Sequence, residues 1–92
     1  MQVQWARKAL LDVERVCLFL ALYDRNESIS LATKLDNAPT RLLAHPRLGE
    51  KVDSYVVKEV RKLSLGNYVM HYEITGDVIL ILRVWHAREE RR

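Results

Sequence analysis

The side chains best suited to chemistry in this sequence are cationic residues and a histidine in its second half. Arg61 and Lys62 are adjacent, and Arg83, His86 and Arg88 lie close together near the end of the chain. Arginine holds and stabilises charged oxygens, and histidine exchanges a proton near neutral pH. This concentration argues against an inert domain, but one histidine with neighbouring arginines does not by itself define an active site.

Other kinds of chemical site find little support. The three histidines share no metal-ligand spacing on one element, and Cys17, the single cysteine, lies within an apolar run. The three glycines stand singly at expected turns and form no phosphate-binding loop. We therefore expect no metal site and no cofactor.

Size and composition limit the classes of protein that need considering. A chain of 92 residues, 49% hydrophobic and 29% charged, predicts a single folded domain over residues 1–92. The net charge of +3 suits nucleic acid or an acidic protein and selects neither. The apolar run Val16–Tyr23 is too short to span a bilayer, and no signal-peptide pattern is present. We therefore expect a cytoplasmic protein without a membrane partner.

The chain changes periodicity near its middle. Residues 1–5 alternate as in a short edge strand, and residues 6–23 have helical spacing. A second helix should run from about Glu27 to Leu43 or Ala44, capped by Asn26, with an apolar stripe of Ile29, Ala32, Leu35, Ala38 and Leu42. Pro39 should cause a kink or break near Asn37. Strands are predicted at 55–63, 68–75 and 78–85. The expected fold is α+β: a short strand, a two-helix hairpin and a three-stranded antiparallel meander packed on the helices.

The last hairpin predicts which side chains share a face. A two-residue loop at Gly76 and Asp77 places Thr75 opposite Val78. The face expected to pack on the helices then holds Tyr68, Met70, Tyr72, Ile74, Ile79, Ile81, Arg83 and Trp85. The opposite face holds Val69, His71, Glu73, Leu80, Leu82, Val84 and His86. This second face mixes apolar and titratable side chains and is the predicted partner-binding groove.

Several segments together resemble the RelE/ParE superfamily of bacterial toxins. They are residues 42–49 (LLAHPRLG), 60–63 (VRKL), 67–72 (NYVMHY) and 79–88 (ILILRVWHAR), together with Trp5, Ala9 and Leu10. The resemblance covers nearly the whole chain and preserves the order of the elements. It implies the toxin of a type II toxin–antitoxin pair, neutralised by a cognate antitoxin, with which it would form a hetero-oligomer.

The superfamily divides into two branches with different targets. The resemblance to RelE-like members implies a ribosome-dependent mRNA endonuclease, whereas the resemblance to ParE-like members implies an inhibitor of DNA gyrase. The RelE pattern has an arginine where this chain has Val69, although Arg88 and His86 match catalytic positions of nuclease members. The chain ending Leu82–Arg88 is closer to the ParE branch. We therefore expect a gyrase inhibitor that is not an enzyme; a RelE-like nuclease with His86 and Arg88 as catalytic residues and an inactive interaction module are the alternatives.

The residues expected to contact the target or the antitoxin come from the meander. They are Arg61, Lys62, Val69, His71, Leu80, Leu82, Arg83, Val84 and Trp85. Arg83 has a second interpretation, because it could instead form a structural ion pair with Glu59 or Glu14.

Overall fold

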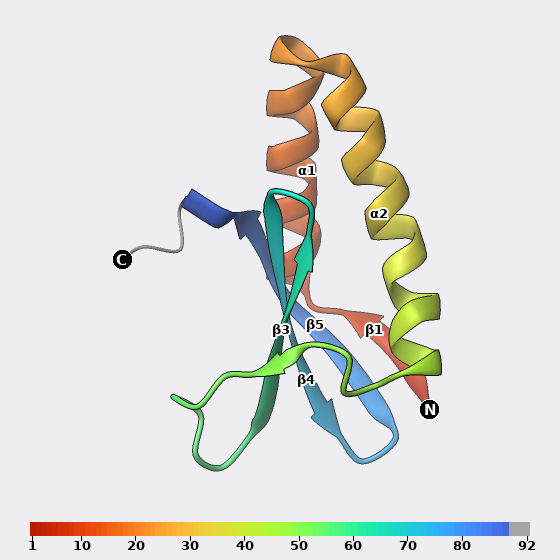
Figure 1. Ribbon diagram of the computed structural model, residues 1–92, viewed down its shortest axis with the longest axis vertical. Helices are drawn as coiled ribbons and strands as arrows, with labels where there is room; N and C mark the ends of the chain where they lie inside the picture. The colour runs from red at the N-terminus through yellow and green to blue at the C-terminus, as the bar shows by residue number, and fades with distance from the viewer. Residues whose placement is uncertain (89–92) are drawn as a thin grey trace.

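The computed structural model describes residues 1–88 as a five-stranded sheet with a helical hairpin on one face (Figure 1). The elements in chain order are β1 (Gln2–Trp5), α1 (Arg7–Tyr23), α2 (Arg25–Ala44), β2 (Glu50–Lys51), β3 (Glu59–Leu65), β4 (Tyr68–Thr75) and β5 (Val78–His86). The sheet order is β1-β5-β4-β3-β2, with β1 parallel to β5 and the other pairs antiparallel. The predicted α+β arrangement is confirmed, and the parallel β1 makes the sheet mixed.

The helices differ from expectation in their cap and in part of their apolar stripe. Asp24, not Asn26, caps α2, because its side chain accepts a hydrogen bond from the Glu27 backbone N–H at 3.1 Å. α2 continues through Pro39 without the expected break. The helix is held by packing along its length, which outweighs the one backbone donor that proline removes.

The buried stripe of α2 is shifted from the predicted one. Its buried side chains are Leu31, Leu35, Ala38 and Leu42, whereas Ile29 and Ala32 are exposed. The stripe still has helical spacing. At its N-terminal end it is shifted by one position, since Leu31 is buried and Ala32 is not.

The strands also differ at their edges. Residues 55–58, predicted as the start of a strand, form a loop, and β3 begins at Glu59. Glu50 and Lys51, outside every predicted strand, form the short strand β2 against β3. The turns at Gly66 and Gly76 have positive φ values of 63° and 56°, which glycine adopts without the steric cost of a Cβ.

A β-bulge in β5 changes the predicted faces. The register matches the prediction from Thr75 opposite Val78 as far as Tyr72 opposite Ile81. It then shifts by one residue, so that Leu82 is extra and His71 lies opposite Arg83. Beyond the bulge the faces of β5 alone are exchanged, so His86 lies on the helix side with Tyr68 and not on the predicted partner-binding face. The core placement of Arg83 and Trp85 is therefore wrong.

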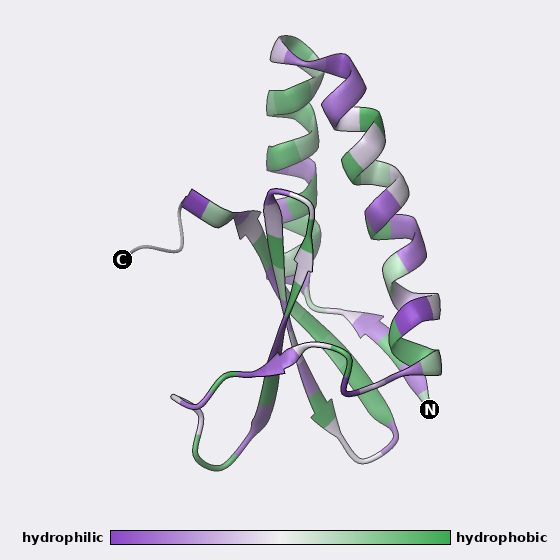
Figure 2. Ribbon diagram, in the orientation of Figure 1, coloured by the Kyte–Doolittle hydropathy of each residue, from purple (hydrophilic) through white to green (hydrophobic). Residues whose placement is uncertain are grey.

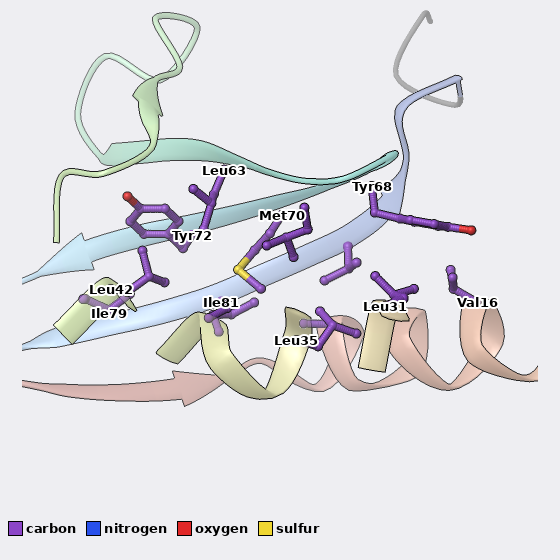
Figure 3. Packing of buried hydrophobic residues seen from close by; sticks show 14 of the residues in the cluster. Val16, Leu31, Leu35, Leu42, Leu63, Tyr68, Met70, Tyr72, Ile79 and Ile81 are labelled. Atoms are coloured by element: carbon purple, nitrogen blue, oxygen red, sulfur yellow. The ribbon is translucent and has the colours of Figure 1, made fainter. Parts of the chain in front are cut away.

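The core lies between the helical hairpin and the sheet (Figure 3). Its buried members are Ala9, Val16, Leu20, Leu31, Leu35, Ala38, Leu42, Leu63, Leu65, Tyr68, Met70, Tyr72, Ile79, Ile81 and Val84. Val84, predicted on the partner-binding face, has no exposed surface and cannot contact a partner in this fold.

Candidate functional site

Arg83 is tied to the first helix by a buried carboxylate. β1 pairs with β5 only as far as Ile81, and α1 lies beside β5 beyond that point. Asp12 of α1 accepts hydrogen bonds from Arg83 Nε at 2.7 Å and Nη2 at 3.1 Å. The backbone N–H of Val84 donates to the same carboxylate at 2.9 Å. The interpretation of Arg83 as a structural ion pair was thus correct in kind, but its partner is Asp12.

Asp12 is a residue whose role sequence reasoning missed. A charged residue within a helix normally faces solvent, yet Asp12 is only 5% exposed. Burial would raise the pKa of Asp12, but the hydrogen bonds from Arg83 and Val84 and the charges of Arg83 and Arg15 outweigh it and lower that pKa. The available signal was position, because Asp12 lies three residues after Ala9 and four before Val16, on the buried stripe.

Arg61 belongs to a network that fastens the loop before β2. Its Nε donates to Glu59 at 2.9 Å and its Nη1 to the Gly49 carbonyl at 2.8 Å. Arg47 also binds Glu59 at 2.9 Å, and hydrogen bonds from Arg61 and Arg47 lower the pKa of Glu59. The Arg61 side chain is 17% exposed. This predicted binding residue therefore has a structural role that limits its access to a ligand.

Tyr72 completes the same network from the core side. The Tyr72 hydroxyl accepts the Gly49 N–H at 2.9 Å and donates to the Pro46 carbonyl at 2.8 Å. Burial raises the pKa of Tyr72, so the hydroxyl keeps the proton that it donates. A Cβ on Gly49 would lie 2.7 Å from the Lys62 carbonyl oxygen, so the loop can approach the sheet this closely only with glycine at that position.

The outer face of the sheet, turned away from the helices, carries other predicted contact residues. We define it by Lys62, Val69, His71, Leu80 and Trp85, which the register places on one side. The rings of His71 and Trp85 meet edge to face with centroids 4.5 Å apart. Val69 is buried, whereas Lys62, His71, Leu80 and Trp85 are partly accessible. Leu82, at the bulge, is also half-buried.

His86 is the last residue of β5 and lines a cavity of about 310 Å³, and Arg88 follows it by two residues. The Arg88 backbone N–H donates to His86 Nδ1 at 3.1 Å, and the His86 ring meets Tyr68 edge-on at 5.0 Å. The cavity is lined by Arg15, Val16, Phe19, Tyr68 and His86, so it lies between α1 and the ends of β4 and β5. Sequence reasoning did not anticipate this cavity, because helical residues far away in sequence form one wall.

Comparison with known protein families shows to which family this chain belongs. The sequence model described as "ParE toxin of type II toxin-antitoxin system, parDE" matches residues 3–91. The chain belongs to the ParE toxin family. The predicted resemblance to RelE/ParE toxins, on the ParE side, is thus confirmed.

A solved structure has the same fold as this ParE-family chain. It is titled "Chromosomal ParDE TA system from P. aeruginosa" and superposes with a TM-score of 0.71 at 22% sequence identity. The match covers 94% of this chain and 95% of the other. A search of curated proteins returns no match. At this level of identity the similarity establishes the architecture, and the family model establishes that the chain is the toxin type of a type II toxin–antitoxin system.

The polar and aromatic side chains considered above fall into three groups according to where they lie in this ParE-family toxin. Arg61 and Arg83 hold its structure together, the outer face presents an aromatic pair with a lysine, and His86 with Arg88 ends β5. Among residues 1–88, no cluster of histidine, cysteine or carboxylate side chains could hold a metal ion. None of the described helices has the length and apolar composition needed to cross a bilayer.

Proposed function

We propose that this ParE-family toxin inhibits DNA gyrase without cleaving nucleic acid, and that a cognate antitoxin neutralises it by forming a complex with it. The observation that carries the proposal is that two arginines of the sheet are held in structural hydrogen bonds and ion pairs. Arg61 is bound to Glu59 and Gly49, and Arg83 is bound to Asp12. The position where the RelE pattern has an arginine holds the buried Val69.

Cleavage of RNA needs several groups that act together at one phosphate. Cations must stabilise the charge that develops on the phosphate, and an acid or base must move a proton. If Arg83 moved to a substrate, the buried Asp12 would lose its bidentate partner and keep only Arg15, 3.8 Å away, and the Val84 N–H, which is costly. His86 and Arg88 alone would then remain for chemistry, so binding to a protein target is better supported than catalysis.

We further propose that gyrase is contacted by the end of β5 and the adjoining outer face. His86 and Arg88 supply polar contacts there, while His71 and Trp85 supply a partly exposed aromatic pair. Aromatic and arginine side chains dominate the binding energy of protein interfaces. A target inside the cell agrees with the cytoplasmic location expected from the sequence.

The test adds purified toxin to two cell-free reactions: plasmid supercoiling by DNA gyrase and translation of a reporter mRNA. We expect supercoiling to be lost while translation and mRNA length are unchanged. The variant His86→Ala/Arg88→Ala should lose at least about tenfold in inhibition, consistent with interface hot spots. The matched control is His45→Ala/Arg41→Ala, which changes exposed residues at the end of α2 and should inhibit like the wild type.

A second candidate function is ribosome-dependent mRNA cleavage, which the proximity of His86 and Arg88 favours. Cleavage of the reporter mRNA with supercoiling spared would replace the gyrase proposal with this one. No effect in either reaction, together with antitoxin binding, would identify an inactive interaction module.

A further inference from the structure

The cavity beside His86 is walled mainly by planar side chains. Phe19, Tyr68 and His86 carry rings, and Arg15 and Val16 complete the lining. The volume of about 310 Å³ is at the lower end of the range for pockets that bind small molecules, about 300–1,000 Å³. A space of this size suits a single planar ring system, with larger substituents left at the mouth.

The three rings come from three elements and do not share one plane. Tyr68 and His86, paired across β4 and β5, meet edge to face with their planes 82° apart. Phe19 belongs to α1, whose C-terminal half is mostly green in Figure 2, and Tyr68 lies with Val16 at one end of the core in Figure 3. A flat ring in the cavity can therefore stack on one side chain and meet another edge-on, the two favoured geometries of aromatic pairs.

The charge around the cavity is positive. Arg15 lines it with a side chain that is 52% exposed, and Arg88 follows the end of β5 by two residues. Asp12, although 3.8 Å from Arg15, is buried and already holds Arg83. Glu14 falls on the far side of the helix by its spacing from Asp12. No carboxylate is among the described residues that line the cavity, so its mouth suits an anionic group.

We propose that the cavity binds a nucleotide, with the base among Phe19, Tyr68 and His86 and the phosphate at the mouth beside Arg15. A nucleotide combines the two features that the lining selects, a planar ring that stacks on aromatic side chains and an adjacent anion that arginine binds. An aliphatic or acidic side chain of a protein offers only one of the two. The same base and phosphate can come from a free nucleotide or from single-stranded DNA, and the experiment distinguishes these sources.

The nucleotide site goes beyond the proposed function and does not depend on it. Binding is measured on the toxin alone, so failure of either proposal leaves the other intact. Because His86 also belongs to the proposed gyrase contact, a bound nucleotide would reduce the inhibition of gyrase and thereby regulate the toxin.

The first experiment titrates the purified toxin, by calorimetry at physiological salt, with four probes. They are AMP, adenosine, ribose phosphate and a short single-stranded oligodeoxyadenylate. We expect saturable binding of AMP, and binding at least about tenfold weaker for adenosine, which lacks the phosphate, and for ribose phosphate, which lacks the base. Tighter binding of the oligonucleotide than of AMP would assign the site to a DNA strand, and weaker or equal binding would assign it to a free nucleotide.

Variants then test whether binding occurs in the cavity. Phe19→Ala should weaken AMP binding by about tenfold because a stacking surface is lost, and Arg15→Gln by a similar factor because the phosphate loses a cation. Both side chains are more than half exposed, so the fold should be retained. The matched controls are Tyr55→Ala, an exposed ring in the loop before β3, and Arg7→Gln, an exposed arginine at the start of α1. Both lie outside the lining and should bind AMP like the wild type.

Three results would overturn the inference. The first is that neither AMP nor the oligonucleotide binds saturably. The second is equal affinity for AMP and for adenosine or ribose phosphate, because the site would then hold only a ring or only an anion. The third is wild-type affinity of Phe19→Ala and Arg15→Gln, which would place the nucleotide elsewhere on the protein.

Discussion

The two halves of α1 differ in how completely the rest of the chain pairs their polar groups and covers their apolar side chains. The first half contains a buried carboxylate, Asp12, with hydrogen bonds from Arg83 and from the Val84 backbone. Within residues 1–88, no buried side-chain nitrogen or oxygen lacks a hydrogen-bond partner. The second half contains leucines that nothing in the described chain covers, such as Leu18 and Leu22. One helix thus anchors the fold at one end and presents an incomplete apolar surface at the other.

Because of this difference, one half of α1 should contribute to the stability of the monomer and the other half to binding of a partner. Removing a group from the satisfied half leaves a buried partner without compensation, which costs free energy within the monomer. Removing a group from the uncovered half changes little until a partner is bound, because its side chains are already in water. Substitutions in the two halves should therefore affect different measurements.

The largest effect on stability is expected for Asp12→Ala. The substitution leaves the Val84 N–H unpaired in the core and removes the carboxylate that Arg83 binds, so the free energy of unfolding should fall by about 2–3 kcal/mol. Urea denaturation measures it. Glu14→Ala, an exposed carboxylate on the same helix, is the control and should stay within about 0.5 kcal/mol of the wild type. Equal midpoints for the two variants would contradict the structural role of Asp12.

A smaller loss is expected for Tyr72→Phe at the other end of the sheet. Without the hydroxyl, the Gly49 N–H loses its acceptor and the Pro46 carbonyl its donor. The free energy of unfolding should fall by about 1–2 kcal/mol. Tyr55→Phe removes the same atom from an exposed loop and should have no measurable effect. Amide hydrogen exchange of residues 47–49 should also quicken in Tyr72→Phe alone, and unchanged exchange would speak against the network.

Acid should reveal the paired carboxylate. The pKa of Asp12 is lower in the folded protein than its ordinary value of 3.8, so the unfolded chain binds the proton more readily. The stability from this pair is therefore fully present above about pH 5 and is lost as the pH falls below 4, by about 1.4 kcal/mol for each unit of pKa difference. Urea midpoints from pH 7 to pH 3 should fall less steeply for Asp12→Asn than for the wild type; parallel curves would show that another group is responsible.

The smallest effect on stability is expected on the uncovered half of α1. Leu18→Ala should change the free energy of unfolding by less than about 0.5 kcal/mol, because its side chain is mostly in water. Leu31→Ala, which empties a buried position on α2, should cost about 2–5 kcal/mol in the same measurement. A large loss from Leu18→Ala would mean that Leu18 is part of the monomer's own core.

Patterns local in sequence were predictable. The helical spacing of residues 6–23, the turn at Gly76 and the apolar strand after it all depend on neighbours within a few positions, and each was predicted within about two residues. The toxin family was also recognisable, since its motifs lie in these same elements. The prediction that His86 and Arg88 are functional rests on the same local information, their place after the last predicted strand.

What the sequence did not reveal depends on contacts between distant segments. The bulge at Leu82 has no local signature, yet it turns Val84 into the core and Arg83 toward Asp12, which is 71 residues away. The cavity beside His86 likewise needs α1 against β5. The sequence by itself determined the elements, their order and the family, because hydrophobic period and turn chemistry act locally. Which cations form ion pairs and which apolar residues stay exposed was decided by the tertiary structure alone. Both depend on which part of α1 packs against β5 and which part extends beyond the sheet.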